Sequence, residues 1–152
     1  MSERSVTHST FSVERNYDAP PARVFAAWAD PAEKRRWWAG GDESLELDFR
    51  VGGRERSAGT VEGMNYVYEA LYQDIVPDER IIYTYEMHIN DQRTSVSVAT
   101  VELKPDGDGT QLVFTEQAAF LDGLDSADLR EGGTGSLLDF LASYLSGERA
   151  SA

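Results

Sequence analysis

The segment Thr134-Gly-Ser-Leu-Leu-Asp-Phe-Leu-Ala-Ser-Tyr-Leu145 carries the clearest periodic pattern in the sequence. At about 100° per residue, its apolar side chains fall within an arc of about 160° on one side of a helix. These side chains are Leu137, Leu138, Phe140, Leu141, Tyr144 and Leu145. Thr134 or Ser136 is a suitable N-terminal cap, and Gly147 follows the last apolar residue. The pattern predicts an amphipathic helix that needs an apolar surface to pack against.

The residues before this helix predict that the surface is a sheet. From Leu45 onward, apolar and polar residues alternate in short runs, and turn residues such as Gly52-Gly53 and Asn90-Asp91 separate the runs. The expected strands are Leu45–Phe49, Arg54–Thr60, Asn65–Ile75, Arg80–Ile89, Thr94–Leu103 and Thr110–Ala118. Phe11–Tyr17 alternates in the same way and predicts an earlier strand. These runs indicate an antiparallel meander.

Two proline-containing segments predict short helices after the first strand. The first helix begins near Pro20 or Pro21, because proline is tolerated in a first helical turn. Asp30-Pro-Ala-Glu33 combines a cap, a first-turn proline and an acidic third residue. This second helix ends at Trp37-Trp38, of which at least one tryptophan is expected to pack on the sheet. The elements together predict an α+β fold in which a curved antiparallel sheet of about seven strands wraps the C-terminal helix.

Length and charge narrow the class of protein. The 152 residues fit one domain, residues 1–152, with an ordered core from about residue 10 to about residue 146. Because 14 basic residues face 27 acidic ones, the net charge of −13 repels phosphate backbones, and no nucleic-acid partner is expected. No apolar run reaches the roughly 20 residues of a membrane span. Residues 1–10 form a polar arm without the apolar core of a secretory signal, so a cytoplasmic location is expected.

Several motifs resemble those of a known superfamily. They are Tyr17–Pro31 followed by Arg36-Trp-Trp38, Asp48–Gly53, Asp74–Tyr85 and Gly109–Glu116. Together they resemble the START-like helix-grip superfamily, in the branch of the Hsp90 ATPase activator homologues. Thr115–Gly123 with Arg130–Thr134 is similar to a stand-alone bacterial subgroup of that branch. The resemblance covers about residues 10 to 146 and implies a sheet gripping the final helix, a fold that hosts lipid carriers, hormone receptors, cyclases and chaperone cofactors.

Residues on the inner side of the expected sheet form a candidate ligand site. By strand alternation several tyrosines point toward the helix, and each buried hydroxyl needs a hydrogen-bond partner from protein, water or ligand. The candidate ligand-binding residues are Trp38, Phe49, Tyr66, Tyr68, Tyr83, Tyr85, Met87, Phe114, Glu116, Leu137, Leu141 and Tyr144. One interpretation is a filled core with hydroxyls at its edges. The other, favoured by the resemblance, is an apolar cavity with a few polar groups.

Glu116 is the candidate that a scaffold explains least well. Continuing the alternation from Leu112 and Phe114 directs its carboxylate inward, where a cation such as Arg130 or Arg93 is needed. In that case Glu116 is a polar recognition group at the mouth of the pocket. Alternatively, a local bulge turns the carboxylate toward solvent. The sequence leaves both interpretations open.

The sequence offers no catalytic constellation. His8 belongs to the polar N-terminal arm and His88 is expected to face outward, so neither fits a nucleophile and base pair. Metal-ligand spacings such as His-Glu-x-x-His do not occur, and no catalytic residue, cofactor or metal ion is expected. Gly132-Gly-Thr-Gly135 is interpreted as an entry loop to the last helix, or as an anion site on free backbone N–H groups.

Three functional hypotheses follow. The leading one is a non-enzymatic domain that binds a small, largely apolar molecule between the sheet and the final helix. The second is a chaperone cofactor or another interaction module, including a homo-oligomer, which the Hsp90-activator resemblance implies. The third is a cyclase- or hydrolase-like enzyme that uses Glu116 as a general base with tyrosine donors.

Overall fold

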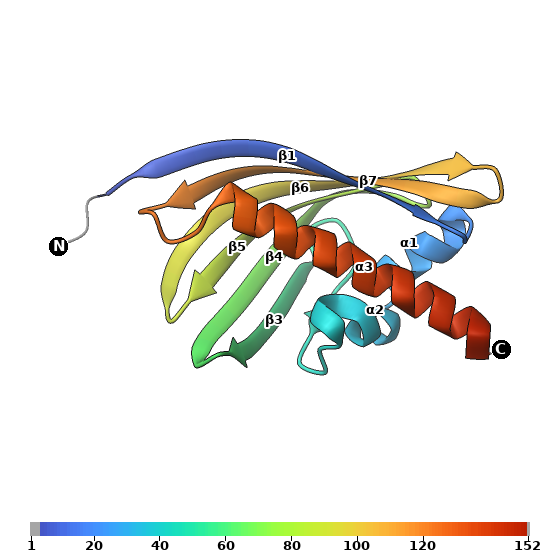
Figure 1. Ribbon diagram of the computed structural model, residues 1–152, viewed down its shortest axis with the longest axis horizontal. Coiled ribbons are helices and arrows are strands. Elements are labelled where there is room, and N and C mark those ends of the chain that lie inside the picture. Colours follow the sequence, from blue (N-terminus) through green and yellow to red (C-terminus); the bar gives the residue numbers. More distant parts are fainter. Residues whose placement is uncertain (1–3, 152) are drawn as a thin grey trace.

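Figure 1 shows a curved sheet arching over one long C-terminal helix in the computed structural model, which describes residues 4–151 and the side chains of residues 4–147. In chain order the elements are β1 (Val6–Tyr17), α1 (Pro21–Ala29), α2 (Pro31–Trp37), η1 (Trp38–Gly40), β2 (Glu46–Leu47), β3 (Arg54–Val61), β4 (Met64–Val76), β5 (Arg80–Ile89), β6 (Gln92–Asp106), β7 (Gly109–Leu121) and α3 (Ala127–Ser151). The predicted α+β helix-grip class is confirmed.

The sheet is antiparallel throughout and its two ends come from the start of the chain. Within residues 4–151 its seven strands follow the order β1-β7-β6-β5-β4-β3-β2. Register shifts between Tyr72 and Asp74 in β4, and between Met87 and His88 in β5, mark bulges that bend and twist the strands. The resulting concave face receives α3 (Figure 1).

The two short helices form as the sequence predicts. Pro31 begins α2, and Oδ1 of Asp30 accepts a hydrogen bond from the Ala32 N–H at 2.9 Å. Both Trp37 and Trp38 are buried, which confirms the prediction that at least one of them packs inside. The Trp28 ring meets the Trp37 ring edge to face at 4.9 Å between centroids.

Helix α3 begins earlier than predicted. Its start is marked by Ser126, whose hydroxyl oxygen accepts a hydrogen bond from the Leu129 N–H at 3.3 Å. The predicted cap at Thr134 or Ser136 is therefore wrong. Arg130 and Thr134 are buried and extend the inner stripe of the helix toward its N-terminus. An apolar stripe does not reveal this first part because the buried residues are polar.

Two further expectations about α3 are also wrong. Gly132 to Gly135 lies inside the helix and is neither an entry loop nor an anion site, since the free N–H groups of a helix belong to its first turn. Gly147 does not end the helix, which continues to Ser151. Phe140, predicted on the buried stripe, is 43% exposed. Its ring covers η1, where a Cβ on Gly40 would lie 3.4 Å from the nearest ring atom.

Strands β3, β4, β6 and β7 extend one to three residues past their predicted ends, and two other strand boundaries differ because pairing decides them. The first strand begins at Val6 rather than Phe11, since Val6 pairs with Leu121 at the end of β7. His8 therefore lies in β1 and not in a polar arm, while residues 1–3 of that arm lie outside the described residues. The predicted strand Leu45–Phe49 shrinks to Glu46–Leu47, because the chain turns back after Asp48, where the Gly53 N–H donates to the Arg50 carbonyl at 2.8 Å.

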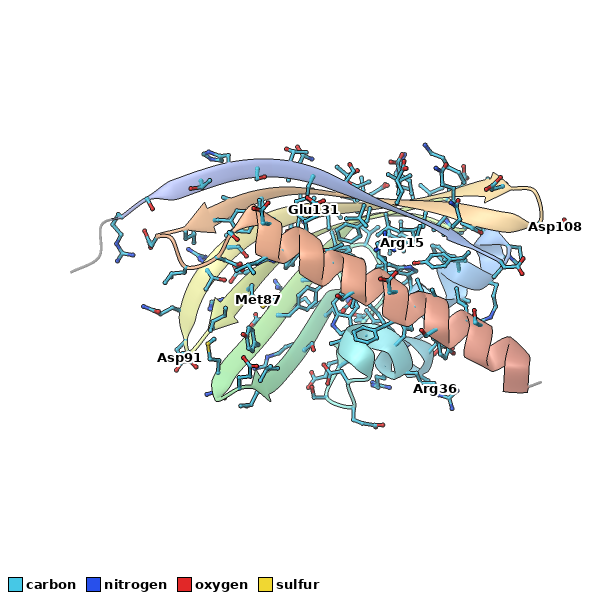
Figure 2. The ribbon with its side chains drawn as sticks, in the orientation of Figure 1. Arg15, Arg36, Met87, Asp91, Asp108 and Glu131 are labelled. Carbon is cyan, nitrogen blue, oxygen red and sulfur yellow. The ribbon has the colours of Figure 1, made fainter. Side chains whose placement is uncertain are left out.

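Most charged side chains lie on the outside of this fold. Figure 2 shows Arg36 on α2 and Asp91 and Asp108 at hairpin tips, each directed away from the sheet and helix, and all three are exposed. Within the described residues, every helix is too short or too polar to cross a bilayer.

Candidate functional site

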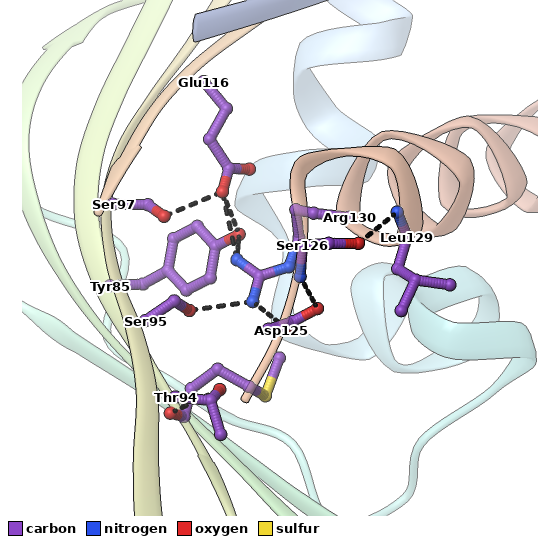
Figure 3. Close-up of polar contacts among 10 residues, drawn as sticks. Tyr85, Thr94, Ser95, Ser97, Glu116, Asp125, Ser126, Leu129 and Arg130 are labelled. Carbon is purple, nitrogen blue, oxygen red and sulfur yellow. Dashed lines mark hydrogen bonds and ion pairs between the residues drawn. The ribbon is translucent and has the colours of Figure 1, made fainter. Parts of the chain in front are cut away.

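A polar cluster lies between the sheet and the start of α3. Its members are Tyr85 on β5, Ser95 and Ser97 on β6, Glu116 on β7, Asp125 in the loop before α3, and Arg130 on α3. We call it the Glu116–Arg130 cluster (Figure 3). Strand alternation positions its sheet members on the inner face, since Tyr85, Ser97 and Glu116 are all buried at alternating positions of their strands.

Glu116 is the centre of the cluster. It is fully buried, and its Oε2 accepts hydrogen bonds from the Tyr85 hydroxyl at 2.7 Å and the Ser97 hydroxyl at 2.7 Å. Nη1 of Arg130 lies 3.1 Å from the same oxygen. The interpretation of Glu116 as a solvated carboxylate after a bulge is therefore wrong. Its inward orientation is confirmed, with Arg130 as the cation, whereas Arg93 faces Glu86 at 3.5 Å.

Arg130 connects the sheet to the loop before α3. Its Nη1 donates to the Tyr85 hydroxyl oxygen at 2.8 Å, and its Nη2 donates to the Ser95 hydroxyl oxygen at 2.7 Å and to Oδ2 of Asp125 at 2.8 Å. Burial lowers the pKa of Arg130, but Tyr85, Glu116 and Asp125 outweigh burial and the net pKa is raised. Arg130 is therefore a permanent cation. The Tyr85 pKa is raised by burial and by the Glu116 charge, so its hydroxyl stays protonated and donates.

A second buried cluster, the Lys34 cluster, joins α2 to the other half of the sheet. Nζ of Lys34 lies 2.7 Å from Oε1 of Glu55 and 3.3 Å from the Tyr72 hydroxyl, and the Tyr72 hydroxyl also donates to Glu55. The ammonium sits 4.2 Å from the Trp38 ring centroid and 5.1 Å from that of Trp28. Burial lowers the pKa of Lys34, and the neighbouring Glu55 opposes that shift. Both charged side chains are fully buried.

Aromatic rings connect the two clusters. Centroid distances are 5.7 Å from Tyr72 to Tyr83, 5.9 Å from Tyr83 to Tyr85 and 5.0 Å from Tyr85 to Tyr68. Trp38 continues the contacts at 5.2 Å from Tyr68. These rings are 1–7% exposed and touch one another, so the layer between sheet and helix is closely packed. We call them the tyrosine layer.

The structure brings most of the predicted site residues to this layer. Trp38, Tyr68, Tyr83 and Tyr85 form it, and Phe114 and Leu141 are buried in the same core. The half-buried side chains of Met87 and Leu137 pack against the core from its rim. Met87 lies between Tyr68 on β4 and Ser95 on β6, which are its cross-strand partners.

Three predicted site residues lie elsewhere. Phe49 packs against Tyr72 at 5.0 Å between ring centroids, at the end of the layer that holds the Lys34 cluster. Tyr66, two residues before Tyr68 on β4, is half-buried. The Tyr144 hydroxyl donates to Glu33 of α2 at 2.8 Å, so its polar group is engaged with α2 and not with the other tyrosines.

Sequence reasoning missed five polar members of the two clusters. They are Lys34, Glu55, Ser95, Ser97 and Asp125. A signal existed for Lys34, because it precedes Trp37 and Trp38 by three and four residues and so shares their helical face. Glu55 and Ser57 likewise alternate with exposed residues on β3.

Two hollows on the surface lie outside the tyrosine layer. One, of about 520 Å³, is on the outer side of β1, β5, β6 and β7 and includes His8, Thr84 and Gln117. The other, of about 510 Å³, runs between β1 and α3 and includes Arg15, Glu131 and Asp139. Both are open to solvent. The lining of the first includes Ser97, a member of the Glu116–Arg130 cluster, whereas the lining of the second includes no member of either cluster.

The described residues offer no metal centre, since no three of their histidine, aspartate and glutamate side chains converge on one point. His88 pairs with Glu86 at 2.9 Å. Both are on the outer side of β5, and the His88 ring contacts a carboxylate there and not a nucleophile.

The buried tyrosines make the fold sensitive to alkali. Burial raises the pKa of Tyr17, Tyr68, Tyr72, Tyr83 and Tyr85 above the unfolded value of about 10. A raised pKa contributes stability that is complete below about pH 10 and is lost as the pH rises further. We expect phenolate absorbance from these five residues to appear only together with the loss of circular dichroism. Reversible ionisation of all seven tyrosines in the folded protein would contradict this.

A curved antiparallel sheet that holds a C-terminal helix, with polar clusters on its inner face, defines a START-like helix-grip domain. Within that class the chain belongs to the family described as Activator of Hsp90 ATPase homolog 1-like protein, whose sequence profile matches residues 18–146. Such a fold places the chain among ligand-binding or activator-like domains.

Solved structures support this assignment. An uncharacterized protein from Rhizobium leguminosarum is 43% identical, with 95% of this chain and 99% of that chain covered and a TM-score of 0.91. A protein from Rhizobium loti is 52% identical, with coverages of 92% and 99% and a TM-score of 0.87. A Staphylococcus aureus protein of unknown function shares the fold at 20% identity, with coverages of 95% and 98% and a TM-score of 0.76. No curated protein matches the chain.

Proposed function

We propose that this protein binds a small, largely apolar molecule between its sheet and α3, without catalysing a reaction, in the cytoplasm. One observation carries the proposal. Oε1 of Glu116 is buried and accepts no hydrogen bond from the described residues, while Oε2 accepts three. A buried carboxylate oxygen without a donor is unfavourable, so it calls for a donor from a bound molecule or from water.

Small side chains around Glu116 support a ligand at this place. On the inner face of β6 the successive residues are Ser95, Ser97 and Ala99, and Ala99 is directly opposite Glu116. Ala118, the next inner residue on β7, is opposite Ser97. Because these side chains are small, a ligand can lie beside the carboxylate once the rim has moved. The tyrosine layer supplies the apolar wall, and the clustered hydroxyls supply the few polar groups that such sites use.

Entry requires movement at the rim, because the layer is closely packed. Met87 is half-buried there, and methionine adapts readily with its three rotatable side-chain bonds and polarisable sulfur. Along the other side, α3 packs against β1, α2 and η1. In this proposal the ligand enters where Met87 on β5 is displaced, on the side away from those helix contacts.

Methionine methyl groups give a direct test. Of the three methionines, Met87 is at the rim, whereas Met64 lies at the β3 to β4 hairpin, four residues before Tyr68 in the chain. With ¹³C-methyl methionine, addition of the neutral apolar probe N-phenyl-1-naphthylamine should shift the Met87 methyl signal and leave the Met64 signal in place. Probe fluorescence should rise with the same concentration dependence.

Two results would contradict the proposal. Equal shifts at Met64 and Met87 would indicate non-specific adsorption, and no shift at Met87 at saturating probe would exclude a site in this layer. A Met87→Leu variant is the matched control, because it keeps side-chain volume and so should retain the fluorescence response while losing the assigned methyl signal.

The family description favours a second candidate, an activator-like interaction with an Hsp90-type chaperone. The methyl experiment distinguishes it. A chaperone partner without a small ligand would broaden the signals of the exposed surface when a purified Hsp90 is added, while the apolar probe would leave Met87 unchanged.

A further inference from the structure

The charges of the Glu116–Arg130 cluster are unequal. One guanidinium, from Arg130, faces two carboxylates, those of Glu116 and Asp125. The other fully buried cation among the described residues, Lys34, is engaged with Glu55 at 2.7 Å. Arg93 and Arg15 are ion-paired to Glu86 and Asp139 outside the cluster. The cluster therefore has one more carboxylate than it has cations, and Glu116 is the fully buried one of the two carboxylates.

That negative charge is least satisfied at Oε1 of Glu116. In Figure 3 all dashed lines to Glu116 end on one carboxylate oxygen, and the other oxygen points away from them. This second oxygen is Oε1, which is buried and has no donor among the described residues. A neutral donor would complete the hydrogen bonding of Oε1 but leave its negative charge in place. A cationic donor completes the hydrogen bonding and also neutralises the charge.

The surroundings suit a cation as well. Arg130 already lies 5.5 Å from the Tyr85 ring centroid and 5.4 Å from that of Phe120, so the aromatic walls of this region face positive charge. Over longer range, the net charge of −13 raises the local concentration of cations and lowers that of anions.

From these observations we infer that the ligand of the proposed site carries a protonated amine, which donates to Oε1 of Glu116 while its apolar part lies against the tyrosine layer. The substrate class is an amphiphilic organic cation. The inference rests on the proposed function, since it assigns the chemistry of the ligand for the same site.

Three probes with the same apolar chain separate the possibilities: n-octylammonium, n-octanol and octanoate. Each is titrated below its aggregation concentration at about pH 7, with the Met87 methyl shift as the readout. We expect n-octylammonium to bind about tenfold more tightly than n-octanol, because a charge-assisted hydrogen bond replaces a neutral one, and octanoate to bind weakest. Added salt should reduce the difference in affinity between the three probes only if the Glu116 charge is accessible to solvent ions.

The outcomes distinguish the two proposals. If none of the probes shifts Met87, the proposed function itself fails. If n-octanol binds as tightly as n-octylammonium, or more tightly, the apolar site stands and the amine is wrong, since water or an alcohol then suffices for Oε1.

Variants of the two carboxylates complete the test. Glu116→Gln should lower n-octylammonium affinity about tenfold and leave n-octanol affinity nearly unchanged. Asp125→Asn removes the second carboxylate at the loop and should reduce the same preference, which keeps the inference testable if Glu116→Gln fails to fold. Glu14→Gln, on the exposed outer side of β1, removes an equal charge and is the matched control. An unchanged amine preference in both site variants would overturn the inference.

Discussion

Replacement of Lys34 by methionine is expected to lower the free energy of unfolding by about 3–5 kcal/mol, because it leaves the Glu55 carboxylate buried without its cation. Methionine fills nearly the same volume as the lysine stem, so the loss reports on charge and not on packing. Urea denaturation followed by tryptophan fluorescence measures the change, and Trp28 and Trp38 next to the ammonium make that signal local.

A double substitution identifies the cause of this loss. Lys34→Met combined with Glu55→Leu removes both charges, and apolar replacement of a buried pair is often neutral or stabilising, so most of the lost stability should return. Lys104→Met, on an exposed position of β6, is the matched control and should change stability by less than about 0.5 kcal/mol. Equal losses in the single and double variants would show that packing, rather than the ion pair, dominates at this site.

Replacement of Arg130 by methionine should lower the free energy of unfolding by a similar amount, about 3–5 kcal/mol, because Glu116 then keeps two neutral donors and no cation. Chemical denaturation of the variant and the natural protein gives the difference directly.

Arg93→Met is the control for this series, since its ion pair with Glu86 is exposed and such pairs contribute about 0–1 kcal/mol. A loss in Arg130→Met no larger than the loss in Arg93→Met would contradict the assignment of Arg130 as the counter-charge of Glu116. Asp125 would be freed in the same variant, but its side chain is partly exposed and can be hydrated.

The sequence was sufficient for the fold because each element has a local signal. Alternating residues predict a strand at Arg80–Ile89, which the structure confirms as β5. An aspartate followed by a proline predicts the start of a helix at Pro31, which the structure confirms as α2. Where a boundary depends on a distant partner, local signals fail. Val6 extends β1 only because Leu121 is opposite, more than a hundred residues away in the chain.

The candidate site was predictable only in part, for a related reason. Apolar periodicity assigns polar residues to the surface, so it does not mark Lys34 or Arg130 as inner residues. Arg130 is expected inside only as one of two possible cations for Glu116. Each is buried because it meets a carboxylate from another element, Glu55 on β3 or Glu116 on β7. The inward parity of Glu116 could be read from β7, but the choice of Arg130 as its cation depends on where α3 begins. That start was misplaced because Thr134 and Arg130 are polar.

The pairing of β1 with β7 also determines when the chain can fold during its synthesis. Val6 is opposite Leu121 and Tyr17 is opposite Thr110. The first strand to be synthesised, β1, can therefore pair only after the last strand, β7, has been synthesised. At about 5–20 residues per second, that interval is about 5–20 s. Throughout it, Phe11, Val13 and Tyr17 lack the neighbours that later bury them. Nascent chains of this protein therefore expose an unpaired apolar strand until translation is nearly finished.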